Sequence, residues 1–398
     1  MNKLLYFLIS LILFSSKIYA TQDTGLTYNR YEQGKHVIHV LTIDPKYFDL
    51  QLVKAHNQII GRETVEAIAL RKNAVAAINA GFFEIAGSDD GRPSLTLMID
   101  GKLFGLRKQL QSLLIIDQNN IQITKCSAKI SIDINGTHII PSQVNYFSNP
   151  QDVTLYNDVW ASTTLTPHTN KEILIDKNFI ITELSKHGDN PIPSKGLVLS
   201  FSKDKTLPLI KVGDSIKLNL EFVDKDNNSI NLSKTASVVT GIPILMQDGK
   251  IVVDKNKEVS HARTALGIRN DGVIVILVAE HIYKQHINDL KLVQVRSILR
   301  KEAGANIEKL TIAEALKILE KQLVSDQAIG LTNTELANYM LNLGCESAIN
   351  LDGGGSSTLF LNGQVVNNVT GDEDEALGKH IMRPVSDAIV IIPKLKKS

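Results

Sequence analysis

The chain has 398 residues, of which 43% are hydrophobic and 21% are charged. This composition is typical of a soluble globular protein, and the length allows one large domain or two to three ordinary ones. The formal net charge is only +1. Proteins that bind nucleic acid usually concentrate positive charge on one face, so the composition excludes nucleic acid as an expected partner.

The N-terminus has the layout of a secretory signal peptide. Lys3 precedes an apolar core, Leu4–Phe14, and a small-residue cleavage site follows at Ile18–Ala20. The apolar core is too short to cross a membrane, and no other segment reaches spanning length. We therefore expect residues 1–20 to be removed. The expected product is an exported protein without a membrane anchor, either in a periplasm or outside the cell.

The first part of the mature chain alternates short strands with one helix. Residues 35–44 and 48–53 show strand-like alternation on either side of a turn at Asp44–Pro45. Residues 63–72 have helical spacing of their apolar side chains. A short buried strand follows and opens into a loop at Ala80–Phe83, and Asp100–Gly101 then predicts a hairpin.

The middle of the chain is rich in predicted strands. Residues 112–235 contain short apolar runs separated by turn signals such as Asn135–Gly136, and Asp248–Gly249 predicts a further hairpin. Residues 272–280 are almost wholly apolar, which is typical of a central strand buried on both faces.

The last third mixes helices with strands. Residues 281–327 have a helical texture, and Thr332 or Asn333 caps a helix that runs to Leu343 and stops at Gly344. No proline- or serine-rich linker divides the mature chain. The sequence therefore predicts one large α+β domain, residues 21–398, with a mixed β-sheet core and flanking helices.

The most informative segment is Asn350–Leu359, in which Asp352 is followed by three glycines and three hydroxyl side chains. Glycines adopt positive φ readily, so Gly353, Gly354 and Gly355 are expected to turn their amides toward one point and hold an anion such as a phosphate. A flexible connector is the alternative, because Gly and Ser also dominate linkers. The apolar segments on both sides favour a functional turn.

Several stretches resemble the phosphodiester glycosidase family, whose animal member is the lysosomal uncovering enzyme that removes N-acetylglucosamine from phosphodiester-linked mannose. They occur in the family's order across most of the mature chain: Ala76–Phe83, His261–Ile268, Gly330–Ala337, Asn350–Leu359 and Arg383–Ala388. The resemblance implies hydrolysis of a sugar-1-phosphodiester in an envelope polymer or extracellular glycan. Where family members carry an Asp-Gly-Arg-like segment, this chain has Glu280–His281, and residues 281–329 then form a predicted helical insertion.

The predicted catalytic residues are Asp352, Glu280 and His261. Asp352 is the preferred base, or the group that stabilises an oxocarbenium-like sugar, because a departing phosphate needs little protonation. Glu280 ends an apolar strand, where a cleft often opens. His261 is a candidate proton donor near neutral pH. For each residue a structural role stays open: a cap on the glycine turn, a solvated strand end, or a packed histidine.

The predicted binding residues hold phosphate or sugar. Arg263 is expected to share a hollow with the glycine turn and to bind the phosphate, although a structural ion pair is the alternative. Asn79 is expected to bind a sugar hydroxyl or the phosphate, and Asp387 either to bind substrate or to accept backbone N–H groups. The full set is Asn79, Phe82, Arg263, Thr264, Gly353, Gly354, Gly355, Ser356, Ser357, Thr358 and Asp387.

Cofactors and alternative functions remain open at this stage. The histidines show no metal-ligand spacing, so no cofactor is assigned, while a divalent cation beside Asp352 is left open. Cys126 and Cys345 are either bridged or two buried thiols. A non-catalytic glycan- or phosphate-binding protein of envelope assembly is one alternative function, and a metal-dependent phosphodiesterase is another.

Overall fold

The computed structural model describes residues 17–20, 25–118, 120–147, 153–254, 259–281, 290, 292–325, 328–374 and 379–394. The predicted apolar core of the signal peptide, Leu4–Phe14, lies outside these residues. The predicted cleavage site ends strand β1 (Lys17–Ala20), which pairs with β2 (Leu26–Gln33). Within the ranges described, we find no helix with the length and apolar character needed to cross a membrane.

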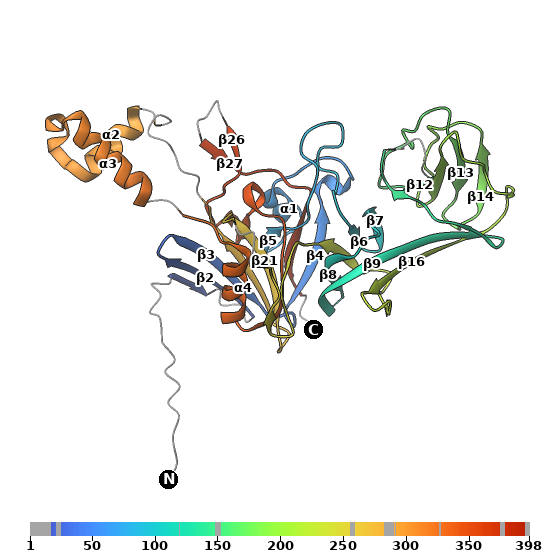
Figure 1. Ribbon diagram of the computed structural model, residues 1–398, viewed down its shortest axis with the longest axis horizontal. Coiled ribbons are helices and arrows are strands. Elements are labelled where there is room, and N and C mark those ends of the chain that lie inside the picture. Colours follow the sequence, from blue (N-terminus) through green and yellow to red (C-terminus); the bar gives the residue numbers. More distant parts are fainter. Residues whose placement is uncertain are drawn as a thin grey trace, which may run out of the picture.

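The centre of the molecule is a sandwich of two antiparallel sheets (Figure 1). The first sheet has eight strands in the order β1, β2, β3 (His36–Ile43), β22 (Ile274–Ala279), β21 (Arg263–Arg269), β23 (Cys345–Asn350), β19 (Ile244–Gln247) and β20 (Lys250–Ile251). The predicted strand at 272–280 is therefore confirmed as central, because β22 pairs with β3 on one side and β21 on the other.

The second sheet has five strands in the order β25 (Gln364–Val365), β24 (Leu359–Leu361), β5 (Ala76–Asn79), β28 (Asp387–Pro393) and β4 (Phe48–Lys54). Its inner face shares one apolar core with the first sheet, in which Leu41 and Ile276 pack with Ile78 and Ile389. The predicted strands on either side of Asp44–Pro45 exist, but they belong to different sheets, so this turn carries the chain across the sandwich.

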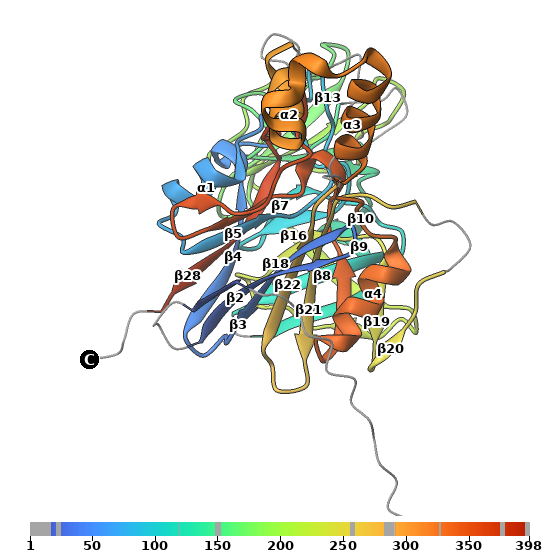
Figure 2. The same cartoon turned by 90° about the vertical axis from the view of Figure 1, so that its left-hand side faces the viewer.

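A helix covers each outer face of the sandwich, and Figure 2 shows them on opposite sides of the strands. Helix α1 (Val65–Arg71) packs against the second sheet, and α4 (Asn333–Asn342) against the first. Thr332 caps α4 in a capping box with Glu335, which confirms the predicted helix start. The result is a four-layer arrangement with the apolar faces of both sheets buried.

A third sheet extends the fold beyond the sandwich. Its order is β17 (Ser229–Ile230), β16 (Ile216–Asp224), β9 (Asn120–Ile134), β8 (Gln111–Asp117), β18 (Ser237–Thr240), β6 (Leu97–Ile99) and β7 (Lys102–Gly105), with β10 (Thr137–Ile139) beside β9. The predicted hairpins at Asp100–Gly101 and Asp248–Gly249 are confirmed, and the predicted turn at Asn135–Gly136 joins β9 to β10.

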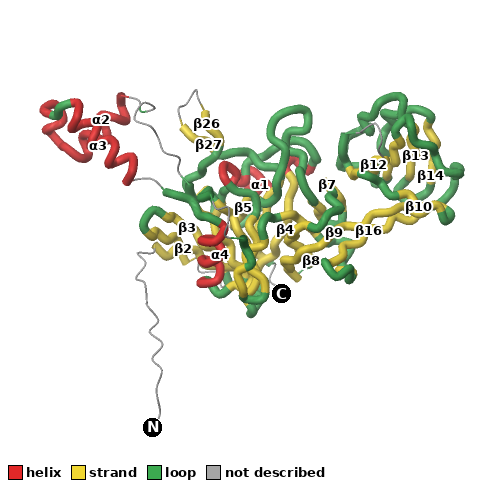
Figure 3. Tube along the Cα trace, viewed as in Figure 1, coloured by secondary structure: helices red, strands yellow, loops and turns green. Residues whose placement is uncertain are grey.

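The long β9 and β16 strands lead to a smaller sheet, which we call the β lobe (Figure 1). It consists of β11 (Gln143–Val144), β12 (Val153–Asn157), β15 (Leu197–Phe201), β13 (Lys171–Ile175) and β14 (Ile181–Ser185). At the opposite end, α2 (Leu292–Ala303), a 3₁₀ turn (Gly304–Lys309) and α3 (Ile312–Ser325) form a helical unit (Figure 3). A small hairpin, β26 (Asp372–Asp374) and β27 (Lys379–Ile381), completes the described elements.

The structure corrects the predicted mixed sheet. Among the described strands, the only parallel pair is β11 with β12, and the three large sheets are antiparallel. Parallel neighbours need crossover connections of about a dozen residues or more. Here short turns join antiparallel neighbours such as β6 with β7 and β21 with β22, and neighbours distant in sequence such as β5 and β28 are antiparallel as well. The predicted flanking helices are present as α1 and α4, while α2 and α3 lie in the predicted helical insertion and stand apart from the sandwich (Figure 1). Both cysteines are buried free thiols, so the disulfide alternative does not apply.

Candidate active site

The predicted site residues gather at one end of the sandwich. The end of β23 lies beside the start of β21, since Asn350 pairs with Ala265. In the second sheet the end of β5 lies beside the start of β28, since Asn79 pairs with Ala388. Residues 351–358, which we call the Asp352 loop, connect β23 of the first sheet to β24 of the second. The loop therefore crosses the open end of the sandwich.

Asn79 fixes both ends of the Asp352 loop. Its side-chain Nδ2 donates to the backbone oxygen of Asp352 at 2.7 Å, and its Oδ1 accepts from the backbone amide of Thr358 at 3.2 Å. The hydroxyl of Thr264 also donates to that Oδ1, at 2.8 Å. Asn79 and Thr264 are fully buried. Both predicted binding residues thus position the loop through hydrogen bonds within the protein.

Each of the three glycines of the loop is favoured by a different local constraint. Gly354 has φ of 59°, a conformation that disfavours other residues. A Cβ on Gly353 would lie 2.8 Å from the backbone oxygen of Ala262. A Cβ on Gly355 would lie 2.4 Å from the Cζ of Arg383. Positive φ was predicted for all three glycines, but within the triplet it occurs at Gly354 only.

The amides of the loop do not converge on an anion as predicted. Gly353 donates to the carboxylate of Asp352, and Gly354 donates to the backbone oxygen of Ala262. The amides of Ser356 and Ser357 close a tight 3₁₀ turn within the loop. The amide of Thr358 is held by Asn79. A phosphate at this site must therefore be bound chiefly by side chains.

Asp352 is the carboxyl group of the loop whose surroundings raise its pKa. It is half-buried, and burial raises the pKa of Asp352 to about 6. The Ser356 hydroxyl and the Gly353 amide oppose that rise, and the negative charge of Asp387 adds to it. The Ser356 hydroxyl stabilises the charge without reaching ordinary hydrogen-bond geometry. A carboxyl group with this pKa exchanges its proton near neutral pH.

Arg383 is the cation that faces the Asp352 loop. Its guanidinium lies against Gly355, and its positive charge lowers the pKa of Asp352. Its Nε donates to Asp372 at 2.6 Å, while its two Nη atoms make no hydrogen bond to the described residues. About a quarter of the side chain, 24%, is exposed. Two fixed, unengaged N–H groups beside a reactive carboxyl suit a phosphate ligand.

Arg263, the predicted phosphate ligand, has other partners. Its Nε donates to the backbone oxygen of Leu331 at 2.9 Å, and its Nη2 donates to that of Val259 at 2.9 Å. The backbone beside Arg263, at Ala262, supports the Asp352 loop through Gly354. The sequence signal for Arg383 was present, because it begins one of the family-like stretches, but its orientation toward the loop depends on the fold.

Beneath the loop, Asp387 and Lys54 form a buried pair of charges on neighbouring strands. Asp387 is 1% exposed and accepts a 2.6 Å hydrogen bond from the amide of Gly81. Burial raises the pKa of Asp387, and Lys54 opposes that rise. Burial also lowers the pKa of Lys54 to about 8, and its ammonium donates to the backbone oxygens of Gly91 and Ser386. The sequence analysis missed Lys54, which ends an otherwise alternating strand.

Glu280 lies at the same end of the sandwich but in a closed network. It is 2% exposed, and its Oε1 accepts from Nε2 of His39 at 2.8 Å and from the amide of Asn368 at 2.7 Å. The other oxygen accepts from the side chain of Asn368. Burial alone would raise the pKa of Glu280, but the hydrogen bonds from His39 and Asn368 outweigh it and lower the pKa. Tyr28 completes the network by contacting the other ring nitrogen of His39.

The remaining predicted residues line the rim of the site. His261 is exposed and lies 6.4 Å from His281 between ring centroids. Burial and the charge of Arg263 lower the pKa of His261, so the neutral ring is favoured. Phe82 is half-buried at the start of the loop after β5. Ser357 is buried, and its hydroxyl has no hydrogen-bond partner within the described chain.

The described residues contain no cluster of three or more His, Cys, Asp or Glu side chains positioned to hold a metal ion. The site instead combines a carboxyl group of raised pKa, an arginine with unengaged N–H groups and a buried hydroxyl. These groups are chemically suited to acid–base work on an anionic ligand.

Comparison with known proteins identifies the family. The family model of phosphodiester glycosidases matches residues 170–307 and 322–392. An uncharacterised protein of Rickettsia conorii is 69% identical over 279 residues, which cover 69% of this chain and 99% of that protein. The chain belongs to the phosphodiester glycosidase family.

Solved structures share the fold at low sequence identity. A hypothetical protein from Synechocystis superposes with a TM-score of 0.65 at 18% identity, over 95% of this chain and 64% of that protein. This chain therefore spans slightly less than two thirds of that protein's length. A Burkholderia pseudomallei protein described as exported gives a TM-score of 0.63 at 18% identity, over 92% of this chain and 74% of that one.

Proposed function

We propose that this protein hydrolyses the glycosidic bond of a sugar-1-phosphodiester in an envelope polymer or extracellular glycan. The observation that carries the proposal is the pairing of Asp352, whose pKa is raised to about 6, with the guanidinium of Arg383. A protein that only binds a phosphorylated glycan needs the cation but not a carboxyl group tuned to exchange a proton.

The reaction divides between these two side chains. Arg383 binds the phosphate and stabilises the negative charge that develops on it as the bond to the anomeric carbon lengthens. The ionised carboxylate of Asp352 takes a proton from a water molecule, whose oxygen forms the new bond to the anomeric carbon. The C–O bond between sugar and phosphate breaks, and its electrons remain on the departing phosphate monoester. The products are a free sugar and a phosphate monoester on the acceptor.

The surrounding residues support that chemistry by position. Asn79 holds the backbone of Asp352, and a 2.9 Å bond from the Gly353 amide orients the carboxylate. The unpartnered hydroxyl of Ser357 is a further donor for a phosphate or sugar oxygen. Phe82, at the rim, offers a half-buried aromatic ring to the sugar.

Hydrolysis in H₂¹⁸O tests the proposal directly. Cleavage of the C–O bond places the label on the released sugar, whereas cleavage of the P–O bond places it on phosphate. Labelled sugar together with unlabelled phosphate monoester is the expected result. Labelled phosphate, or binding of the substrate without turnover, would overturn the proposed function. Loss of activity in a chelator would identify a metal-dependent reaction instead.

Export is part of the same proposal, since the substrate class lies outside the cytoplasm. The support is the sequence pattern of residues 1–20, with Lys3 before an apolar core and Ala20 at the cleavage site. Expression of the full chain followed by cell fractionation and N-terminal sequencing tests it. A mature protein beginning at Thr21 outside the cytoplasm is expected. A cytoplasmic protein that retains residues 1–20 would contradict export.

A further inference from the structure

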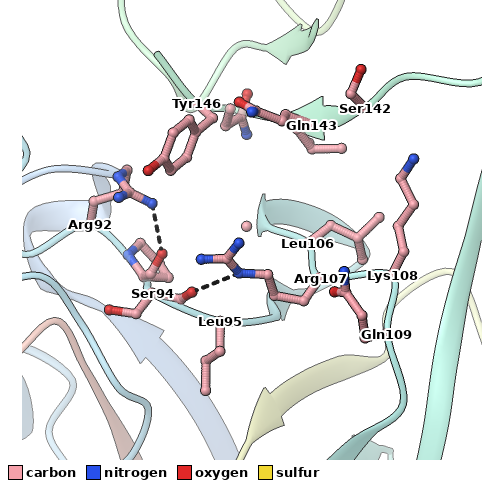
Figure 4. Close-up of a pocket in the computed structure, with 14 residues that line it drawn as sticks. Arg92, Ser94, Leu95, Leu106, Arg107, Lys108, Gln109, Ser142, Gln143 and Tyr146 are labelled. Atoms are coloured by element: carbon pink, nitrogen blue, oxygen red, sulfur yellow. Dashed lines mark hydrogen bonds between the residues drawn. The ribbon is translucent and has the colours of Figure 1, made fainter. Parts of the chain in front are cut away.

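A second polar cavity lies between the third sheet and the β lobe, and Asp352 is not among its lining residues. Its volume is about 360 Å³, within the range of roughly 300–1,000 Å³ typical of small-molecule sites. One wall comes from residues 92–95 and 105–109, and the other from residues 142–146 of the β lobe (Figure 4). Asn145 joins the two walls, because its Nδ2 donates to the backbone oxygen of Leu103 at 2.8 Å.

The lining of this cavity is positively charged. Arg92, Arg107 and Lys108 contribute to it, and none of the described lining residues is acidic. Arg92 is neutralised from outside by Asp89, at 2.9 Å, and its guanidinium stacks over the ring of Tyr146 at 4.3 Å. This stacking fixes the upper edge of the cavity. The two remaining cations have no acidic partner among the described residues.

Arg107 presents most of its hydrogen-bonding capacity to the cavity. Its Nε donates to the backbone oxygen of Ser94 at 3.1 Å, which orients the guanidinium. The two Nη atoms make no hydrogen bond within the described chain, and Figure 4 shows the guanidinium in the middle of the lining residues. The ammonium of Lys108 likewise has no described partner. Two unpaired cations in a concave polar site attract an anion.

The cavity is connected to the proposed active site through the loop after β5. The backbone amide of Ser94, in the cavity wall, donates to the backbone oxygen of Phe82 at 3.0 Å. Phe83 forms a β-bridge with Pro93, another wall residue. Phe82 lies three residues after Asn79, which holds the Asp352 loop. The loop after β5 therefore borders both the cavity and the proposed active site.

We propose that this cavity is a second anion-binding subsite, which holds a neighbouring phosphate of a polyphosphorylated glycan while another phosphodiester occupies the Asp352 site. The proposal rests on the proposed function for the identity of the cleaved bond. Arg107 supplies paired N–H donors to the phosphate oxygens, and Lys108 supplies a second charge. The substrate class is accordingly a polymer or oligomer with phosphates on successive units, in preference to an isolated sugar phosphodiester.

Binding of defined probes tests the subsite without requiring catalysis. The probes are a disaccharide with a phosphate on each unit, its monophosphorylated counterpart, and a disulfated disaccharide of the same size. The double variant R107Q/K108Q is expected to lose about 10- to 100-fold in affinity for the bisphosphorylated probe, because charge-assisted hydrogen bonds are removed. Its affinity for the monophosphorylated probe should change less. If the double variant lost as much affinity for the disulfated probe, the cavity would attract anions in general. That result would overturn the assignment to phosphate.

A matched control uses two exposed lysines on the β9 and β16 strands, in the double variant K125Q/K217Q. It removes the same charge and is expected to bind the bisphosphorylated probe as the unaltered protein does. A similar loss in this control would show that overall charge is responsible. Arg107→Lys keeps the charge but loses the planar fork, so partial affinity is expected. Thermal unfolding of each variant checks that the fold is retained.

Kinetics separate this inference from the proposed function. With an oligomeric phosphodiester substrate, R107Q/K108Q should raise KM about 10-fold or more with little change in kcat. An unchanged KM and unchanged probe affinity would overturn the subsite while leaving the proposed function intact. Probe binding that depends on Arg107 and Lys108, without any turnover of sugar-1-phosphodiesters, would overturn the proposed function and leave the subsite.

Discussion

Asp352 and Glu280 stand at the same end of one sandwich, yet their surroundings differ. Both oxygens of Glu280 are engaged, by His39 and by two groups of Asn368, and these bonds lower its pKa despite burial. Asp352 accepts one amide bond, from Gly353, and its pKa rises to about 6. Burial with full hydrogen bonding makes a carboxylate a structural group. Burial with incomplete hydrogen bonding leaves it able to exchange protons near neutral pH.

The largest expected effect separates these two carboxyl groups by activity. Asp352→Asn should lower kcat by ~10³–10⁴-fold, as the loss of an essential acid–base group does in other enzymes. Glu280→Gln should mainly lower the free energy of unfolding, because it weakens the buried contact with His39. Steady-state kinetics and denaturant unfolding of both variants provide the measurement. If Glu280→Gln lowered kcat as much as Asp352→Asn does while the fold stayed intact, Glu280 could not be a purely structural group.

The buried charges of Lys54 and Asp387, beneath the Asp352 loop, are expected to affect the stability of the fold. Lys54→Met should lower the free energy of unfolding by about 3 kcal/mol, because Asp387 then stays buried without its compensating cation. Chemical denaturation measures this change. Lys394→Met is the matched control, since Lys394 faces Asp49 across the same two strands but near solvent, and its effect should be about 1 kcal/mol or less. If the two variants lowered the free energy of unfolding equally, the buried ammonium of Lys54 would have no special role in supporting the site.

The pH dependence of stability sharpens the assignment of Asp352. Its folded pKa of about 6 exceeds the ordinary aspartate pKa of 3.8, so between these values the folded protein binds more protons than the unfolded chain. The free energy of unfolding therefore loses up to about 3 kcal/mol through this group as pH rises from below 4 to above 6. Asp352→Asn cannot titrate, so its stability relative to the unaltered protein should improve by about 2–3 kcal/mol between about pH 4 and pH 7.5.

The same pKa predicts the pH profile of catalysis. If Asp352 acts as the base, kcat/KM should rise with pH through about 6 and level off above it. A profile that instead falls as pH rises through that value would make the protonated carboxyl the active form.

The smallest expected effects test how Arg383 is placed. Gly355→Ala should lower kcat/KM about 10- to 100-fold, because the added Cβ would lie 2.4 Å from the Cζ of Arg383 and 2.6 Å from the backbone oxygen of Gly371. The guanidinium that faces Asp352 must then move. Gly354→Asn is the control, since space is open there and Asn tolerates a φ of 59°. It should retain nearly full activity. Similar losses in both variants would point to the loop's backbone and not to Arg383.

Local patterns were enough to predict much of this fold. The turns at Asp100–Gly101 and Asn135–Gly136, the capping box at Thr332 and the apolar run at 272–280 all reflect interactions within a few residues. The partition of strands between two antiparallel sheets was not predicted. That partition depends on which apolar faces meet across the core, and alternation in one strand carries no information about its partner.

The sequence predicted which residues form the candidate site better than it predicted how their side chains and amides are oriented. Asp352, Asn79 and Thr264, all predicted as site residues, do lie together. The direction of a guanidinium is decided by contacts distant in sequence, so Arg263 was preferred although Arg383 faces the loop. The predicted amide cradle failed for a related reason. The acceptors for those amides are the Asp352 carboxylate, backbone oxygens of the loop itself and of Ala262, and the side chain of Asn79. These pairings cannot be read from a glycine-rich segment alone.

The hydrogen bonds of the Asn79 side chain have a consequence for which parts of the fold can vary. Among the described residues, the partners of this side chain all belong to β21 or to the Asp352 loop. The β lobe and the α2–α3 unit contribute nothing to these bonds. Changes in the length or shape of those outlying parts therefore leave these hydrogen bonds, and with them the position of the Asp352 backbone, unaltered.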